Sequence, residues 1–280
     1  MLQKTILSWY EKNGRKLPWR ETTDPYKVLV SEMMLQQTQV DRVIPKYHAF
    51  LQRFPTVESL AQGSGGEVLQ YWSGLGYNRR ALYLHKCAQA LQAKKEFPQS
   101  VEELQKLPGL GPYTAAAVLS FALNKDVVVI DVNISLLYKR LFYPRTDVDT
   151  VAREVLPSGR SRDWHNALMD LGSLYCHRKK PDCVHCPLQT LCASAGDEQK
   201  ITSTWEKKKV KAFKSSDRIV RGGILKLLTK KDGMDLDMIF RALELQGIQR
   251  EKELFLIIVK KLEADGLIKI QKEKIFLPKS

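Results

Sequence analysis

An aspartate that follows a short apolar run is the first residue whose position suggests chemistry. The run Val127–Ile130 leads to Asp131, and Asn133 follows two residues later. A carboxylate at the end of an apolar run is partly dehydrated, which costs stability but suits a catalytic charge. We therefore take Asp131 as a candidate catalytic residue, with Asn133 beside it.

A glutamate on an apolar helix is the second candidate. The residues Asp24-Pro25-Tyr26 open a predicted helix that contains Glu32. Glu32 lies three and four positions after Leu29 and Val28, so it shares a side with core residues. A glutamate in such a place is either satisfied by a buried partner or functional, and the helix alone favours the structural interpretation.

Four of the five cysteines lie close together, in the order Cys176-x6-Cys183-x2-Cys186-x5-Cys192. Thiolates this close must converge on one centre and do not form a disulfide framework. Zinc sites usually use two short knuckles, and only Cys183 and Cys186 make one here. The single loop therefore favours a cubane iron–sulfur cluster, with zinc as the alternative. The fifth cysteine, Cys87, is predicted to be a small buried hydrophobe.

The loop between these cysteines also carries basic side chains, among them Arg178 and Lys179. A cluster that only holds such a loop against a phosphate needs no redox role.

The stretch LPGLGPYTAAAV contains a turn that would grip a phosphate. A short helix ends at Leu107-Pro108, and a second helix starts near Pro112. Between them, Gly109 and Gly111 are predicted to have positive φ. The N–H groups of the turn and of the helix N-terminus make a site for one phosphate. An ordinary helix–turn–helix corner is the alternative.

Length and composition bound the class of protein. With 280 residues, 44% hydrophobic and 9% aromatic, the chain forms one large or two modest folded domains. The net charge of +14 indicates a polyanionic partner, most often nucleic acid, with a solvated lysine-rich surface as the alternative. Residues 1–16 predict an amphipathic helix and no signal peptide, and no apolar stretch is long enough to span a membrane. We expect an intracellular protein.

Helical periodicity runs through the first 196 residues, and no alternation of period two occurs before residue 265. This part is therefore predicted to be all-α. Residues 197–217 are polar and lysine-rich and predict a linker. Residues 218–280 predict three helices and a hairpin of two short strands, a small winged helix-turn-helix domain that could bind DNA or another protein.

These features together resemble the helix-hairpin-helix DNA glycosylases with an iron–sulfur cluster. Over residues 5–195 the segments PWR, PYKVLVSEMMLQQTQVDRVIPKY, RFPTV, WSGLGY and LHK look like the A/G-specific adenine DNA glycosylases. The resemblance implies a six-helix barrel with the hairpin at 22–131 and a cluster domain from 1–21 and 132–196.

The resemblance also assigns roles. Glu32 matches the general acid toward adenine N7, Asp131 the carboxylate that stabilises the oxocarbenium-like sugar, and Asn133 and Tyr113 residues that support this pair. The expected DNA contacts are Gln36, Gln37, Thr38, Tyr77, Gly109, Gly111, Arg178 and Lys179. The expected cofactors are a [4Fe-4S] cluster on Cys176, Cys183, Cys186 and Cys192 and a monovalent cation at the hairpin.

The chemistry agrees with these roles. Breaking an N-glycosidic bond resembles glycoside hydrolysis, in which one carboxyl keeps a proton while the other stays ionised. The target base must be flipped out of the helix, with phosphates held on both sides. Lyase-type relatives carry a lysine just after the hairpin, where this chain has Tyr113-Thr114. We therefore predict a monofunctional enzyme that leaves an abasic site.

The chain departs from the family pattern at three places. Val132 replaces a glycine between Asp131 and Asn133, Asn78 follows Tyr77 where a second tyrosine is usual, and the winged helix stands where an α/β domain reads 8-oxoguanine. Adenine opposite guanine or 8-oxoguanine is the expected target. A thymine or uracil mismatch glycosylase is the alternative, although pyrimidines lack the N7 that Glu32 would protonate. A non-catalytic DNA-binding or regulatory protein is the alternative of another class.

The expected partner is double-stranded DNA with a mismatch or lesion, bound by a monomer, and no membrane. A protein partner on the winged helix is a further expectation. The expected place is the bacterial nucleoid or, in a eukaryote, the nucleus.

Overall fold

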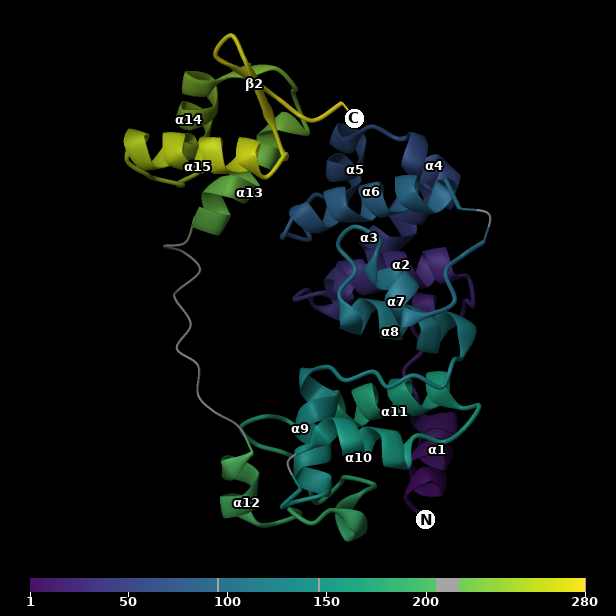
Figure 1. Cartoon of the computed structure of the whole chain (residues 1–280). Helices are drawn as coiled ribbons and strands as arrows, with labels where there is room; N and C mark the ends of the chain where they lie inside the picture. Colours follow the sequence, from purple (N-terminus) through teal and green to yellow (C-terminus); the bar gives the residue numbers. More distant parts are fainter. Residues whose placement is uncertain (95, 146, 205–216, 280) are drawn as a thin grey trace. The chain divides into compact units, whose positions relative to one another are not determined.

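The computed structural model describes residues 1–94, 96–145, 147–204 and 217–279. These residues form fifteen α-helices, two 3-10 helices and three short strands, and all three strands follow residue 233 (Figure 1). The prediction of an all-α fold is therefore confirmed for the described part of the first 196 residues. By its contacts the chain divides into two compact units. Unit 1 contains Met1–Leu29, Pro98–Lys106 and Leu110–Lys208; unit 2 contains Val30–Phe97, Leu107–Gly109 and Lys209–Ser280.

Unit 1 is built almost entirely from helices. Its elements are α1 (Leu2–Asn13), η1 (Pro18–Arg20), the first half of α2 (Pro25–Leu35), α7 (Val101–Gln105), α8 (Pro112–Leu123), α9 (Val132–Leu141), α10 (Val148–Val155), α11 (Ser161–Leu174), η2 (Gln189–Leu191) and α12 (Glu198–Ser203).

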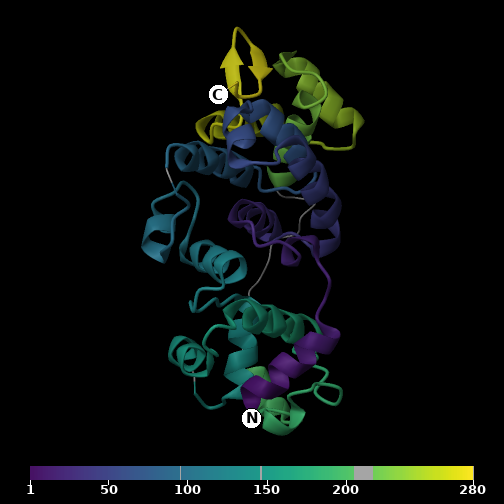
Figure 2. The same cartoon turned by 90° about the vertical axis from the view of Figure 1, so that its right-hand side faces the viewer.

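The core of unit 1 lies between α1, α9 and α11. α11 packs against both other helices, and Figures 1 and 2 show α1 alongside it. Ile6, Ile134 and Trp164 are fully buried in this core. The indole N–H of Trp164 donates to the hydroxyl of Tyr138 at 3.1 Å, which satisfies the polar atom of a buried aromatic side chain.

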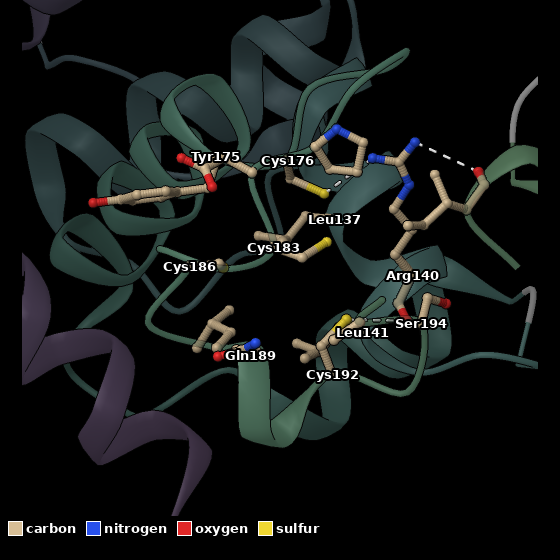
Figure 3. A pocket seen from close by; sticks show the side chains of 15 residues that line it. Leu137, Arg140, Leu141, Tyr175, Cys176, Cys183, Cys186, Gln189, Cys192 and Ser194 are labelled. Carbon is tan, nitrogen blue, oxygen red and sulfur yellow. Dashed lines mark hydrogen bonds between the residues drawn. The ribbon is translucent and has the colours of Figure 1, made fainter. Parts of the chain in front are cut away.

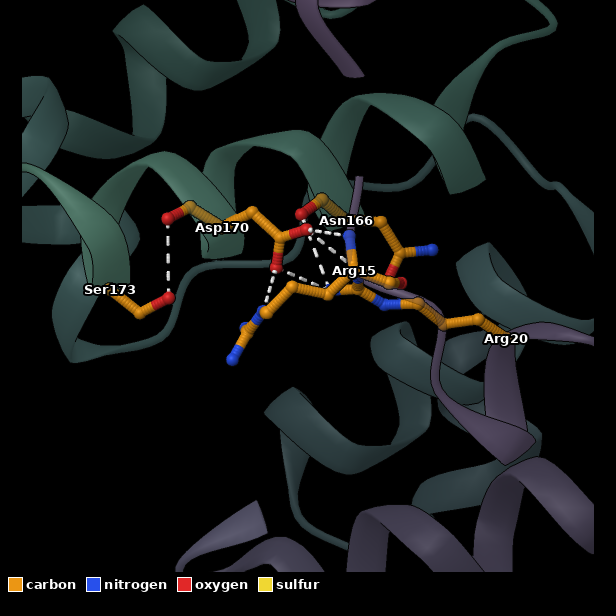
Figure 4. A network of polar contacts seen from close by, with 5 residues as sticks. All are labelled: Arg15, Arg20, Asn166, Asp170 and Ser173. Atoms are coloured by element: carbon orange, nitrogen blue, oxygen red, sulfur yellow. Dashed lines mark hydrogen bonds and ion pairs between the residues drawn. The ribbon is translucent and has the colours of Figure 1, made fainter. Parts of the chain in front are cut away.

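A buried carboxylate ties the segment after α1 to α11. The side chain of Asp170 is fully buried and accepts hydrogen bonds from the backbone N–H of Arg15 at 2.9 Å and from the guanidinium of Arg20 at 2.8 and 2.9 Å (Figure 4). Burial opposes the ionisation of Asp170, but these donors outweigh it and hold the pKa of Asp170 below its ordinary value. The pair is a structural link, because each charge is satisfied by the other.

Unit 2 contains the second half of α2 and two groups of elements. The first group is α3 (Val40–Arg53), α4 (Val57–Gln62), α5 (Gly65–Trp72) and α6 (Arg79–Gln92). Its core contains an aromatic cluster, in which the ring centre of Phe50 lies 5.0 Å from that of Phe54 and 6.0 Å from that of Trp72. Cys87 is fully buried in α6, as predicted.

The second group of unit 2 is α13 (Asp217–Leu228), β1 (Met234–Asp235), α14 (Leu236–Leu245), α15 (Lys252–Ala264), β2 (Lys269–Gln271) and β3 (Lys274–Phe276). The three helices and the hairpin of β2 and β3 (yellow arrows in Figure 2) agree with the prediction. β1 adds a third antiparallel strand, in the order β1-β3-β2. Sequence reasoning missed β1 because two residues are too short to show alternation.

The end of the second group contacts α5. The N–H of Gly66 donates to the carbonyl of Pro278 at 2.6 Å. A Cβ atom added at Gly65 or Gly66 would lie 3.1 Å from the side chain of Pro278 or Leu277, so the two glycines permit this close approach.

The predicted linker lies partly outside the described residues. α12 occupies its first part, with the carboxylate of Asp197 accepting from the backbone N–H of Lys200 and with Ile201 buried. Residues 205–216 belong to the part of the chain that is not described. No helix among the described residues has the length and apolar character needed to cross a bilayer.

Candidate active site

Asp131 is the N-cap of α9. Its Oδ1 atom accepts the backbone N–H groups of Asn133 at 2.9 Å and of Ile134 at 2.7 Å, two of the donors that a helix start leaves unsatisfied. Its Oδ2 atom accepts only the side-chain amide of Asn133, at 3.3 Å, among the described residues. One carboxylate oxygen therefore holds the helix, while the other keeps capacity for a further partner.

The electrostatics of Asp131 carry two opposing effects. Burial raises its pKa above the ordinary value of 3.8, and the hydrogen bonds from Ile134 and Asn133 lower it by a smaller amount. The predicted dehydration of this carboxylate is thus confirmed. Asn133 itself is exposed on the first turn of α9.

A buried histidine holds the backbone just before Asp131. His165 of α11 accepts the N–H of Val129 at its Nε2 atom, at 3.1 Å, and its Nδ1 atom lies 2.8 Å from the carbonyl of Ser161. Burial lowers the pKa of His165 to about 4, so the ring is neutral at pH 7 and donates through Nδ1. Sequence reasoning missed His165, because its contact with Val129 joins segments 36 residues apart.

α11 also makes room for Asn133. A Cβ atom at Gly172 would lie 2.9 Å from the Cβ of Asn133. Gly172 therefore lets the two helices approach where α9 begins.

Glu32 lies in the second half of α2 and is buried. Its exposed fraction is 6%, and its neighbours Ser31, Met33 and Met34 are buried as well. Glu32 makes polar contacts. The prediction that it shares a side with core residues is confirmed.

The turn after α2 carries three predicted DNA contacts. Gln37 is exposed and has a φ of 55°, which a non-glycine residue adopts only in tight turns. The hydroxyl of Thr38 lies 3.3 Å from the carbonyls of Gln36 and Leu75. The turn is thereby tied to the segment before Tyr77.

Tyr77 is 41% exposed and also has positive φ, 47°. Two guanidinium groups lie over its ring, that of Arg80 at 5.5 Å and that of Arg218 at 5.4 Å. Arg218 also donates to the hydroxyl of Tyr77 at 3.0 Å.

The glycine turn differs from its prediction at one residue. Gly109 has the expected positive φ of 79°, and a Cβ there would lie 2.4 Å from the side chain of Tyr83. The prediction of positive φ at Gly111 is wrong: its φ is −84° and its ψ 175°, and it is the N-cap of α8. The reason is Pro112, since a residue before proline is pushed into extended backbone. Tyr113 follows in the first turn of α8.

The four cysteines of the loop line one pocket in unit 1, shown in Figure 3. Leu137, Leu141 and Leu188 supply apolar wall. Arg140 of α9 closes one side: its guanidinium lies 3.4 Å from the sulfur of Cys176 and donates to the carbonyls of His177 and Arg178, both at 2.9 Å.

Two further properties of the cysteine pocket concern the binding of a single metal ion and the ionisation of its thiols. Among the described residues, no three His, Cys, Asp or Glu side chains are placed to share a single metal ion. Burial raises the pKa of the Cys186 thiol to about 11.

The loop presents its basic side chains to solvent. Lys179 and Arg178 are exposed, between Cys176 and Cys183.

The predicted site residues thus fall into three groups. Unit 2 brings the Glu32 helix, the turn Gln36–Thr38 and Tyr77 together. Unit 1 pairs Asp131 with Asn133 and separately gathers the four cysteines. That Glu32 and Asp131 face one cavity remains the prediction made from the sequence.

The comparisons with known proteins decide the family. Residues 30–156 match the family described as HhH-GPD superfamily base excision DNA repair protein. An adenine DNA glycosylase of Mycolicibacterium smegmatis is 35% identical over 278 residues, which cover 94% of this chain and 91% of the relative. The chain belongs to the adenine DNA glycosylase family of HhH-GPD proteins.

Two further matches show how far this membership extends. An adenine DNA glycosylase of Buchnera aphidicola is 40% identical over 68% of this chain, and the chain spans 57% of that relative. The solved structure of a thermostable thymine-DNA glycosylase superposes with a TM-score of 0.63 and 28% identity, covering 69% of this chain and 94% of that chain. The fold of the HhH-GPD glycosylases is therefore present, as the sequence predicted.

Proposed function

We propose that this chain is a monofunctional adenine DNA glycosylase of base excision repair, which hydrolyses the bond between a flipped adenine and its deoxyribose. The single observation that carries the proposal is the 35% identity to an adenine DNA glycosylase along 94% of the chain, which includes Glu32 and the Asp131 cap. Guanine or 8-oxoguanine is the proposed partner of the adenine.

The two carboxyl groups would divide the work. Glu32 is buried on its helix and is proposed to donate a proton to adenine N7. Protonation turns the base into a better leaving group. The Oδ2 atom of Asp131 is suited to stabilise the positive charge that develops on the sugar. Asn133 holds that oxygen, and Tyr113 is proposed to support the pair.

The DNA would be held by backbone and basic groups. Nothing lies within 4 Å of a Cβ built at Gly111, so its bare backbone leaves room for a phosphate at the N-terminus of α8. The exposed Lys179 and Arg178 would contact a second phosphate. Gln36, Gln37, Thr38 and Tyr77 would face the opened base pair, and a monovalent cation would sit at the hairpin.

The absence of a lysine after the hairpin limits the chemistry. Tyr113 and Thr114 occupy the first turn of α8, and neither has an amine that could attack the sugar. Water is therefore the proposed nucleophile, and the product is an abasic site.

A [4Fe-4S] cluster is the proposed resident of the cysteine pocket. The shared pocket, its leucine wall and the Arg140 contact to Cys176 fit a group held by four thiolates. When bound, it would fix the loop that carries Arg178 and Lys179.

Residues 1–196 are proposed to act as the glycosylase region. Residues 218–280 are proposed to form a winged helix that adds DNA or protein contacts. The proposed place of action is the nucleoid or the nucleus.

A thymine or uracil mismatch glycosylase is the second candidate, favoured by the likeness to the thymine-DNA glycosylase structure. One experiment separates the two. Duplexes with A, T or U opposite G or 8-oxoguanine are incubated with the purified protein and then treated with alkali, which cleaves at abasic sites. Cleavage at adenine alone supports the proposal, cleavage at T or U alone replaces it with the second candidate, and no cleavage refutes both.

A further inference from the structure

The end of the Glu32 helix is held by one buried arginine. Helices leave their last four carbonyls without intrahelical donors, and α2 has no glycine cap to satisfy them. Arg80 of α6 supplies the donors instead. Its Nη1 atom donates to the carbonyl of Met33 at 2.7 Å and to that of Met34 at 3.0 Å, and also reaches Gln36.

The other nitrogens of Arg80 bind the two neighbouring segments. Nη2 donates to the hydroxyl of Thr38 at 3.1 Å and to the carbonyl of Gly76 at 3.0 Å, and Nε donates to the carbonyl of Tyr77 at 3.3 Å. The guanidinium also lies 5.4 Å from the ring centre of Trp72. A single side chain therefore joins the Glu32 helix, the turn after it and the Tyr77 segment.

The charge of Arg80 is balanced in an unusual way. The side chain belongs to a residue that is 7% exposed, and burial lowers the pKa of Arg80 to about 10, so it stays charged at pH 7. Among the described residues its partners are carbonyl oxygens, a hydroxyl and two aromatic faces, and no carboxylate. Burying a charge without an ion pair is costly. Such a cost is expected where an arrangement must be held for function.

We propose that Arg80 is a positioning residue of the excision reaction, which holds Glu32, the turn Gln36–Thr38 and Tyr77 in one fixed arrangement. The inference rests on the proposed function of Glu32 as general acid. Glu32 directly precedes Met33, so a shift of the Met33 carbonyl moves the carboxyl group that must reach the base. A misplacement of about 1 Å can cost on the order of 10²-fold in rate.

Lysine cannot replace this arginine. The guanidinium offers five N–H donors in a planar fork, and the structure uses all three nitrogens on three segments. An ammonium group offers three donors from one atom and can serve only part of this set. Arg80→Lys therefore keeps the positive charge but loses most of the hydrogen bonds that the planar guanidinium donates to the three segments.

A second arginine, Arg20, whose side chain is 9% exposed, provides the matched control. Arg20 also uses its fork, but on the carboxylate of Asp170 in unit 1 (Figure 4), whereas the partners of Arg80 belong to unit 2. Arg20→Lys should lower the melting temperature as much as Arg80→Lys does, while leaving excision unchanged.

The test compares both variants with the wild type in single-turnover excision of adenine, with enzyme in saturating excess so that the rate constant does not depend on the folded fraction. Affinity is measured on a duplex whose 2′-fluoro-adenosine resists cleavage. Arg80→Lys is expected to lose about 10²-fold in rate with affinity within about fivefold of wild type. A rate within twofold of wild type, or an equal loss in Arg20→Lys, overturns the inference.

Two further results keep the outcomes apart. If the wild type releases no adenine, the proposed function fails, independently of Arg80. If Arg80→Lys does not fold, Thr38→Val takes its place, because it keeps Arg80 and removes one acceptor of the same network. Since Thr38 is also a proposed DNA contact, the affinity of this variant is measured as well, and only a loss of rate at unchanged affinity supports the inference. This variant is expected to lose about three- to tenfold in rate, and a normal rate counts against the inference.

Discussion

Replacing Asp131 by asparagine should remove catalysis without weakening the fold. Asparagine is as good an N-cap as aspartate, and its Oδ1 atom can accept the same N–H groups of Asn133 and Ile134. Its amide group would take the place of Oδ2, 3.3 Å from the amide of Asn133. Because Asn133 is exposed, its amide can turn over and present oxygen instead. The helix start therefore survives the change.

The effect on stability follows from the raised pKa of Asp131. A raised pKa means that the folded protein binds this proton more tightly than the unfolded chain does. The associated stability is complete below the ordinary value of 3.8 and is lost as the pH rises through the raised pKa. At pH 7 the charged Asp131 is thus a net cost, which asparagine does not carry. Asp131→Asn should melt at the same temperature as wild type or higher.

The effect on the rate is much larger. Loss of one electrostatic contact to a developing charge costs about 2.7–4 kcal/mol, or 10²–10³-fold. Loss of the carboxylate that we propose faces the sugar should reach or exceed the upper end. Single-turnover excision of adenine, followed by alkali cleavage, measures this change, and binding to uncleavable duplex should persist. In the wild type the rate should also fall on acidification at a pH above that of an ordinary aspartate.

Two outcomes would refute this reasoning. A rate for Asp131→Asn within tenfold of wild type would remove the catalytic role. A melting temperature several degrees lower would show that the charge stabilises the fold, contrary to the burial argument. Asp131→Ala is the control for the cap, since it should lose about 0.5–2 kcal/mol of stability.

The remaining predictions address the other proposed contacts. Glu32→Gln should lose excision by at least 10²-fold and still bind DNA; near-normal turnover would exclude it as the acid. Gly111→Ala should fold normally, because its backbone is extended and its surroundings are open, yet bind duplex more weakly in a titration. Borohydride should trap no robust covalent adduct, because Tyr113 stands where an amine is required, and an efficient adduct would contradict hydrolysis. Arg218→Ala should weaken duplex affinity about two- to fivefold with an unchanged single-turnover rate, as expected for one exposed cation–π contact; a lost rate would place Arg218 in the chemistry.

Local pattern was enough to predict most of the helices and the convergence of the cysteines. Helical periodicity over the first 196 residues predicted an all-α part, and it extends through α9 and α11 because their buried faces belong to one core. Because the four cysteines lie in one short loop, their side chains were predicted to converge, and they line one pocket. The dehydration of Asp131 followed from the apolar run before it.

Polar contacts between residues far apart in the sequence could not be predicted from local pattern. One residue that makes such contacts, Arg80, can still be recognised as buried from its position on α6. Arg80 lies in phase with the buried Leu84, Cys87 and Leu91 on α6, whereas its neighbour Arg79 faces solvent. The helical phase thus marks Arg80 as a buried charge in need of partners. Nothing in the sequence names those partners, because the carbonyls that it binds lie up to 47 residues away.

Two aspartates, Asp170 within α11 and Asp131 at the start of α9, show that burial alone does not determine a role. Asp170 is the more buried of the two, yet the guanidinium groups of Arg15 and Arg20 lower its pKa and neutralise its charge. Asp131 has a raised pKa, and in the described part of the chain it receives hydrogen bonds but no ion pair. Its negative charge is therefore stabilised by dipoles only and remains uncompensated. A positive charge that develops beside Asp131, such as that on a sugar losing its base, would be stabilised by this carboxylate, whereas the charge of Asp170 is already neutralised by arginine. We therefore expect Asp131, and not Asp170, to be the catalytic aspartate.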